Sequence, residues 1–342
     1  EPSRNHRRSL KFADNSSRRQ WINSVGNEEN NLSYAINYTE DENKFNQSEK
    51  NHLPEIASLN FSFQNNEDTY SNMSYNVSSN SLLGFNVGVR PLKAFLITEQ
   101  RQGYLPFTAA MDNGYAFGRN HIFNGDNSLN YTIYQGDHST TQQRESGLLI
   151  NFSDFDLRND SYINAYAGYN VEDKTFLRNQ TSGAFGQTNA STLHTGFSYE
   201  SNVSDDLYFG SNFNLGYTNT TVSENSLLSS VDPLITSQYV VGMVGHNLTD
   251  ENDSLSVSLS QPLSVERGSA KIKIPYYVSE SSNGFNEKEI DMSVRDRFNN
   301  LNIDYIYNFS DTSQLHTGIT IGMTNFEELI YSSALVNYKL QY

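Results

Sequence analysis

The stretch Ile330-Tyr-Ser-Ser-Ala-Leu-Val-Asn-Tyr-Lys-Leu-Gln-Tyr342 decides the fold that the sequence predicts. Because successive side chains of a β-strand point to opposite faces, counting by twos divides this stretch into two sets. One set is largely apolar and carries two aromatics near its end: Tyr342, Leu340, Tyr338, Val336, Ala334 and Ile330. The other set includes Gln341, Lys339, Asn337 and Ser333. In a transmembrane β-barrel such a strand turns its apolar face to lipid and buries the final aromatic in the interfacial girdle.

The same alternation recurs along the chain and predicts twelve strands. The candidates are 32–38, 59–63, 68–77, 129–133, 148–152, 160–171, 193–199, 207–217, 254–260, 301–309, 315–323 and 330–342. Two weaker candidates, 269–278 and 289–294, could be separate strands or extensions of neighbouring spans beyond the bilayer. Bacterial single-chain barrels have even strand counts, so we expect an antiparallel transmembrane β-barrel of twelve strands, with fourteen as the alternative. The last strand is expected to pair with the first span, 32–38, and remove the open edge.

The composition fits this architecture. Aromatics make up 13% of the 342 residues, with 22 Tyr and 20 Phe against a single Trp, as expected for strands and membrane-interface belts. No run approaches the roughly 20 apolar residues of a spanning helix, which excludes a helical membrane protein. The mean hydropathy of −0.62 does not exclude a barrel, because each lipid-facing residue is offset by a polar one on the other face. The absence of cysteine excludes disulfides and thiolate metal sites.

Two stretches depart from the alternation. Residues 79–127 show no sustained period of two, and we expect either an extracellular lid or a segment tucked into the lumen. Residues 1–26 form a basic linker or lumenal plug ahead of a barrel at 27–342, with a disordered tail as the alternative. The plug candidates, which would face acidic inward groups such as Asp304, are Arg4, Arg7, Arg8, Arg18, Arg19 and Trp21. The chain begins at Glu1 without an apolar leader, so a signal peptide is expected to have been removed or to lie upstream.

No pattern of residues predicts catalysis. The seven histidines are scattered without a partnered nucleophile motif, so we expect no enzyme activity. Calcium could bind loop carboxylates at Asp154 and Asp156, or at Asp250, Glu251 and Asp253. Solvated turn charges are far commoner, and we therefore predict no metal and no cofactor. The net charge of −16 disfavours nucleic acid as a partner.

Two motifs carry a resemblance to a known family. The first is Ser182-Gly-Ala-Phe-Gly186, followed by Ser191-Thr-Leu193. The second runs from Leu259 to Pro275, and its most specific part is an expected turn at Ser260, Gln261, Pro262 and Leu263, followed by Gly268, Ser269, Ala270 and Pro275. In the first motif the matching residues are Gly183, Ala184, Phe185 and Gly186. From about residue 82 to the end, the sequence resembles the C-terminal translocator barrel of subtilisin-like serine protease autotransporters of Gram-negative bacteria.

The resemblance implies a twelve-stranded barrel in the bacterial outer membrane, surrounded by lipid and lipopolysaccharide and inserted with the barrel assembly machinery. Its implied role is to anchor an N-terminal passenger and enable its export, with Tyr338, Leu340 and Tyr342 as the assembly signal. The passenger's catalytic residues are absent, so the chain is either the barrel part of a longer protein or a relative put to another use. The alternatives are a structural partner of another outer-membrane protein or a porin-like channel. A third, an outer-membrane enzyme, would require a Ser or Asp with a His at one rim.

Overall fold

The computed structural model describes sixteen segments of the chain. They are residues 18–27, 30–39, 55–66, 68–75, 105–108, 111, 113–123, 127–137, 143–156, 161–177, 183–224, 226–279, 282–294, 297–310, 313–324 and 328–340. Apart from the 3-10 helix Gly183–Phe185, all regular elements in these segments are strands. No helix among the described residues is long and apolar enough to cross a membrane. The chain divides into two compact units. The first contains Glu1–Arg90 and Ala110–Phe152, and the second contains Pro91–Ala109 and Ser153–Tyr342.

The first unit is an antiparallel meander. Its strands are β1 (Arg18–Asn27), β2 (Asn30–Thr39), β3 (Glu55–Asn66), β4 (Thr69–Tyr75), β5 (Asn113–Phe123), β6 (Asn127–Asp137) and most of β7 (Arg144–Asp156). They follow one another in sequence order, and the register of β3 on β4 places Phe61 opposite Met73. Exposed Phe63 and Met73 and buried Asn60 and Ser74 show that the apolar residues share one face and the polar residues the other.

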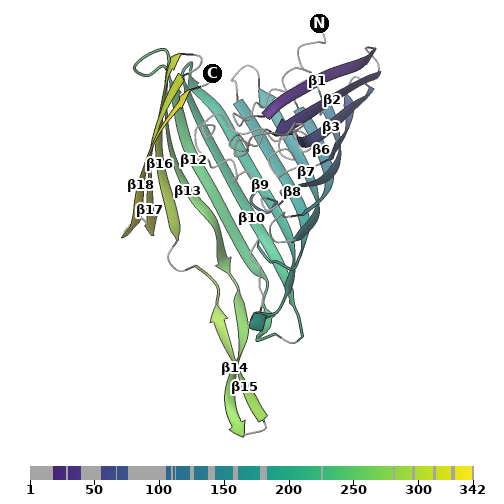
Figure 1. Cartoon of the computed structure of the whole chain (residues 1–342), viewed down its shortest axis with the longest axis vertical. Coiled ribbons are helices and arrows are strands. Elements are labelled where there is room, and N and C mark those ends of the chain that lie inside the picture. The colour runs from purple at the N-terminus through teal and green to yellow at the C-terminus, as the bar shows by residue number, and fades with distance from the viewer. Residues whose placement is uncertain are drawn as a thin grey trace, which may run out of the picture. The chain divides into compact units, whose positions relative to one another are not determined.

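The second unit continues the meander with longer strands (Figure 1). They are β8 (Ser161–Asp173), β9 (Thr188–Ser204), β10 (Leu207–Val222), β12 (Leu234–His246), β13 (Asp253–Arg267), β16 (Phe298–Ser310), β17 (Ser313–Thr324) and β18 (Glu328–Leu340). In β8, Tyr169 and Val171 are 48% and 42% exposed, whereas Asn164 and Asn170 are completely buried. This is the reverse of a water-soluble sheet, and it suits a sheet whose apolar face meets lipid.

All twelve predicted strands are confirmed, but the count of twelve is too low. Among the described residues, fifteen strands belong to the meander order, because β1, β5 and β12 were not predicted. In β12 the pattern is obscured because Val240 and Val244 are buried on one face while Val241 and Met243 are exposed on the other. Apolar residues on both faces remove the period of two from the sequence.

The expectation for 79–127 is corrected in the same way, because this stretch contains β5. Exposed Tyr115 and Phe117 alternate there with Ala116 and Gly118. Glycine weakens the signal because it has no side chain and is depleted in strands. The pairing of Phe117 with Ile133 of β6 supplies what the local sequence lacks.

The connections of the second unit differ in length at the two ends of its strands. Residues 205–206 join β9 to β10, and residues 247–252 join β12 to β13. At the other end, 174–187 join β8 to β9, and 268–297 join β13 to β16. Apart from the three residues between β17 and β18, the short connections lie at one end and the long ones at the other, an asymmetry characteristic of outer-membrane barrels.

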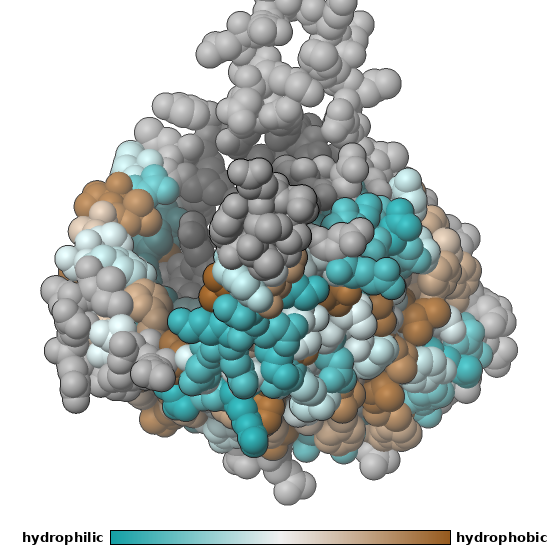
Figure 2. Space-filling model, turned by 90° about the horizontal axis from the view of Figure 1, so that it is seen from below, coloured by the Kyte–Doolittle hydropathy of each residue, from teal (hydrophilic) through white to brown (hydrophobic). Residues whose placement is uncertain are grey.

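A small sheet stands at the long-loop end. It contains β11 (Leu228–Val231), β14 (Ser269–Ser279) and β15 (Ser282–Asp291), and β14 and β15 project past the ends of β13 and β16 (Figure 1). The two weak strand candidates correspond to β14 and β15. A core of Leu228, Val231, Leu234 and Ala270 fixes the base of this sheet. Seen from that end, hydrophilic residues gather around it (Figure 2), where Lys271 of β14 pairs with Glu289 of β15.

The predicted partner of the last strand is wrong. β18 pairs with β17, with Tyr338 opposite Leu315. The predicted first span is β2, and β2 already pairs with β1 on one edge and with β3 on the other. A strand has only two edges, so β2 has none left for β18.

Candidate functional site

The polar faces of β8, β9, β10 and β12 carry a continuous hydrogen-bonded ladder, here called the polar wall. Asn212 Nδ2 donates to Ser198 Oγ at 2.8 Å, and Asn214 Nδ2 donates to Gln238 Oε1 at 2.8 Å. The Tyr166 hydroxyl donates to Asn214 Oδ1. Because an amide side chain both donates and accepts, such groups satisfy one another across four strands. The polar wall therefore keeps its geometry without an apolar core.

Residues 105–108, here called the wall segment, lie on this polar wall within the same unit. Leu105, Phe107 and Thr108 are all at most 3% exposed, and the Thr108 amide donates to Leu105 O at 3.1 Å to close a turn. Asn170 Nδ2 of β8 donates to Phe107 O at 3.1 Å. For these four residues, the prediction of a tucked-in segment is supported over that of a lid.

A glycine in β10 makes room for the wall segment. A Cβ at Gly216 would lie 2.5 Å from Phe107 Cε1 and Cζ, closer than side chains approach one another. The absence of a side chain at Gly216 thus leaves a notch for the Phe107 ring. The sequence carries no signal for this fit, because the notch and the ring are more than a hundred residues apart.

His194 of β9 lies between two rings. It stacks on Phe107 with ring centroids 4.9 Å apart and planes at 25°, and it meets Tyr166 edge-on at 5.8 Å. The side chain is 2% exposed, and neither ring nitrogen has a hydrogen-bond partner among the described residues. A charge there would be costly, because a buried cation needs a partner. The imidazole therefore acts as a neutral aromatic contact for the wall segment.

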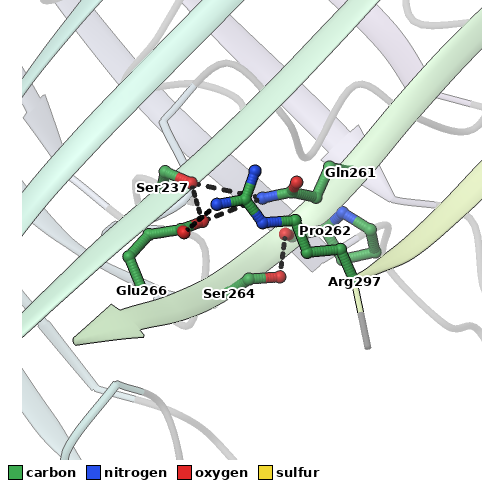
Figure 3. A network of polar contacts seen from close by, with 6 residues as sticks. All are labelled: Ser237, Gln261, Pro262, Ser264, Glu266 and Arg297. Carbon is green, nitrogen blue, oxygen red and sulfur yellow. Dashed lines mark hydrogen bonds and ion pairs between the residues drawn. The ribbon is translucent and has the colours of Figure 1, made fainter. Parts of the chain in front are cut away.

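A second polar network lies where β12, β13 and the start of β16 meet (Figure 3). Glu266 accepts hydrogen bonds from Ser237 Oγ at 2.5 Å and Gln261 Nε2 at 3.4 Å. Arg297 Nη2 lies 2.5 Å from the second oxygen of Glu266. Gln261 is 1% exposed, so the network satisfies a buried amide as well as a charge pair.

This network corrects the expected turn at residues 260–263. Ser260, Gln261, Pro262 and Leu263 lie within β13, and the pairing with β12 shifts register between Ser237 and Tyr239, opposite them. Proline has no amide hydrogen to give to a ladder, so it sits at an irregularity of the strand. The Ser264 hydroxyl donates to Pro262 O at 3.0 Å across this irregularity.

The remaining motif residues organise loops. Ala184 O accepts from the Leu227 amide at 2.7 Å, which ties the β8–β9 connection to the β10–β11 connection. Gly186 and Gly268 have φ angles of 64° and 150°, which favour glycine. The other motif residues lie in regular elements. The 3-10 helix contains Gly183 and Phe185, and β14 contains Ser269, Ala270 and Pro275.

The plug candidates fall into two groups. Arg18, Arg19 and Trp21 lie in β1, where the register pairs them with Thr39, Tyr38 and Ile36. Strand structure thus begins inside the predicted linker 1–26, where β1 pairs with β2 along its whole length. Arg4, Arg7 and Arg8 lie outside the described residues. Asp304, which was expected to face these arginines, instead forms a hydrogen bond between its Oδ1 and His316 Nε2 at 3.0 Å.

Two of the three residues of the expected assembly signal lie among the described residues. Tyr338 and Leu340 belong to β18, whereas Tyr342 lies outside the described residues. Tyr338 is 53% exposed, and its ring meets that of Phe309 at 6.1 Å. Its exposure fits the predicted position in an aromatic girdle.

Two of the candidate calcium carboxylates, Asp250 and Asp253, make hydrogen bonds at the β12–β13 turn. Asp253 accepts hydrogen bonds from the amides of Leu248 and Thr249 at 2.7 and 3.0 Å, and from the Thr249 hydroxyl. Asp250 accepts from the Tyr307 hydroxyl at 2.9 Å. Among the described residues, no group of three or more His, Asp or Glu side chains is placed to hold a metal ion.

No family model and no curated relative matches the chain. Solved structures of OmpT, an outer membrane protein of Vibrio cholerae, are similar in fold. One in-vitro folded form has a TM-score of 0.53 at 10% identity, over 94% of this chain and 87% of that one. A trimer form has a TM-score of 0.54 at 9% identity, over 94% of this chain and 88% of that one.

The chain has an outer-membrane β-barrel fold. The likeness confirms the predicted fold class, an antiparallel all-β architecture of many strands, and agrees with the predicted location in a bacterial outer membrane. At about 10% identity the likeness supports the fold alone, so the role of the protein must be inferred from its own residues.

Proposed function

We propose that the protein is a porin-like channel of the bacterial outer membrane, in which the polar strand faces line a water-filled path. The observation that carries the proposal is the wall segment on the polar wall. A chain segment that leaves the strands and docks on their polar face narrows a path without replacing it by an apolar core.

The chemistry of the polar wall supports passage of small polar solutes. Its residues include Ser, Thr, Asn, Gln and Tyr, whose side chains can donate and accept hydrogen bonds. The ladder from Ser198 through Asn214 to Gln238 ties these groups to one another, so they form a fixed lining. We assign no enzymatic step to this lining.

The translocator role remains a second proposal that rests on the resemblance at residues 182–193 and 259–275. The strand number weighs against it, because fifteen strands among the described residues exceed the twelve that the resemblance implies. A wall segment drawn from between β4 and β5 also differs from a lumen filled by the segment ahead of the barrel.

Conductance in planar bilayers tests the channel. The folded protein is expected to insert with discrete, stable conductance steps. Phe107→Ala should raise the step size, because removing the ring widens the path at the polar wall. Phe185→Ala is the matched control, since Phe185 is 46% exposed in a loop and should leave the step unchanged. Folded protein that inserts but never conducts would contradict the channel and favour a translocator whose lumen is filled.

A further inference from the structure

Phe107 anchors the wall segment on the polar wall, and one of its contacts can change charge. Phe107 receives one hydrogen bond at its carbonyl, fits the notch at Gly216 and stacks on His194. The stack places a titratable imidazole directly beneath the wall segment, 2% exposed and without a hydrogen-bond partner in the part of the chain that the structure describes. Histidine is the side chain whose charge ordinarily changes between about pH 5 and 8.

Among the described residues packed against His194, no carboxylate is in place to balance a positive charge. Phe107 faces it from the wall segment, Tyr166 from β8, and Gly216 pairs with it from β10. Tyr166 is the titratable group in this set, and it is neutral in acid. By register the carboxylates of Glu172 and Glu200 lie further along β8 and β9, since His194 pairs with Gly168. Protonated His194 would be a buried cation with no acceptor among these residues, which favours moving the wall segment away and admitting water.

We propose that the wall segment is an acid-released latch, docked on the polar wall while the imidazole of His194 is neutral and released when it is protonated. The proposal rests on the channel function and assigns its regulation. Release uncovers the Tyr166, His194 and Gly216 surface and widens the path, so the open state is the acid state.

Single-channel conductance at about pH 7.5 and about pH 4 tests the latch, because imidazole ordinarily titrates between these values. The wild-type step should be larger at the acid pH. His194→Phe keeps an aromatic ring in the stack but cannot take up a proton, and it should lose the acid response. His316→Gln is the matched control, because His316 pairs with Asp304 on β16 and β17 and its loss should leave the acid response intact. An acid response retained in His194→Phe would overturn the latch.

A second readout does not depend on conductance. The chain has a single tryptophan, so Trp21→Phe combined with Phe107→Trp reports on position 107 alone. Its emission should shift to the red in acid, as the ring moves from the polar wall into water, and the shift should vanish when His194→Phe is added. Absence of conductance at both pH values would refute the channel alone, whereas an emission that stays constant would refute the latch alone.

Discussion

At the level of single residues, Asp253 shows how a carboxylate that resembles a metal ligand in sequence serves the backbone instead. Hydrogen bonds from the Thr249 hydroxyl, the Leu248 and Thr249 amides and Tyr305 lower the pKa of Asp253. All these donors come from the β12–β13 turn or from the neighbouring strand β16. The carboxylate thus shapes a short turn that sets the register of β13 against β12.

Replacement of this carboxylate should weaken the fold in a pH-dependent way. Because the folded pKa of Asp253 is lowered, its contribution is present above the ordinary pKa of about 3.9 and is lost as pH falls through the folded value. Asp253→Asn should lower the midpoint of thermal unfolding at neutral pH, and the difference from wild type should shrink in acid. Asp205→Asn, an exposed carboxylate in the β9–β10 turn, is the control and should leave the midpoint unchanged. An equal deficit at all pH values would contradict this role.

The close fit of Phe107 against Gly216 allows a separate prediction about conductance. A methyl group there would meet the Phe107 ring and the Thr236 hydroxyl, which are side-chain atoms rather than backbone. Gly216→Ala should therefore displace the wall segment, raise the conductance step at neutral pH and reduce the acid response. Leu215→Ala changes the preceding residue of β10, which lies on the opposite, exposed face. It should change neither the conductance step nor the acid response. A conductance equal to wild type in Gly216→Ala would show that the ring does not occupy the path.

For whole strands, the alternation of faces makes a prediction within β17. Ile319 is 49% exposed on the apolar face, while the hydroxyl of the next residue, Thr320, donates to Asn302 Oδ1 at 2.9 Å on the polar face. Ile319→Arg should cost about 2–4 kcal/mol of folding free energy in a bilayer, because it places a charge against lipid. Thr320→Arg should cost much less, because its side chain faces the polar side. Denaturant titration in lipid vesicles measures both, and equal costs would mean that the faces are assigned wrongly.

Sequence predicts best the strands that have one polar face and one apolar face. In β8 and β17 most apolar residues fall on one face, and both strands were predicted. In β12 buried Val240 and Val244 share the polar face, and in β5 glycines interrupt the pattern, so pairing with neighbours decides these strands. The alternation in 160–171, 193–199 and 207–217 predicted a polar face for each of β8, β9 and β10. The contact of the polar wall with Phe107 was not predicted, because that contact joins segments that no local pattern relates.

For the molecule as a whole, the signs of the buried charges decide which ions the channel should prefer. Among the described residues, the buried ionisable groups on the polar faces include the carboxylates of Glu145, Glu172 and Glu200, and no Lys or Arg is buried. The net charge of −16 has the same sign. Carboxylates along a narrow path raise the local concentration of cations and exclude anions.

The channel is therefore expected to prefer K⁺ over Cl⁻, as measured by the reversal potential across a KCl gradient. The preference should be stronger near 0.1 M salt, where charges act over about 10 Å, than near 1 M, where they act over about 3 Å. Glu172→Gln with Glu200→Gln should reduce it, because both carboxylates lie on the polar faces of β8 and β9. Glu224→Gln with Glu251→Gln removes the same charge from exposed connections and should leave the reversal potential unchanged. If both pairs shifted it equally, the overall charge of the protein rather than the lining would set the selectivity.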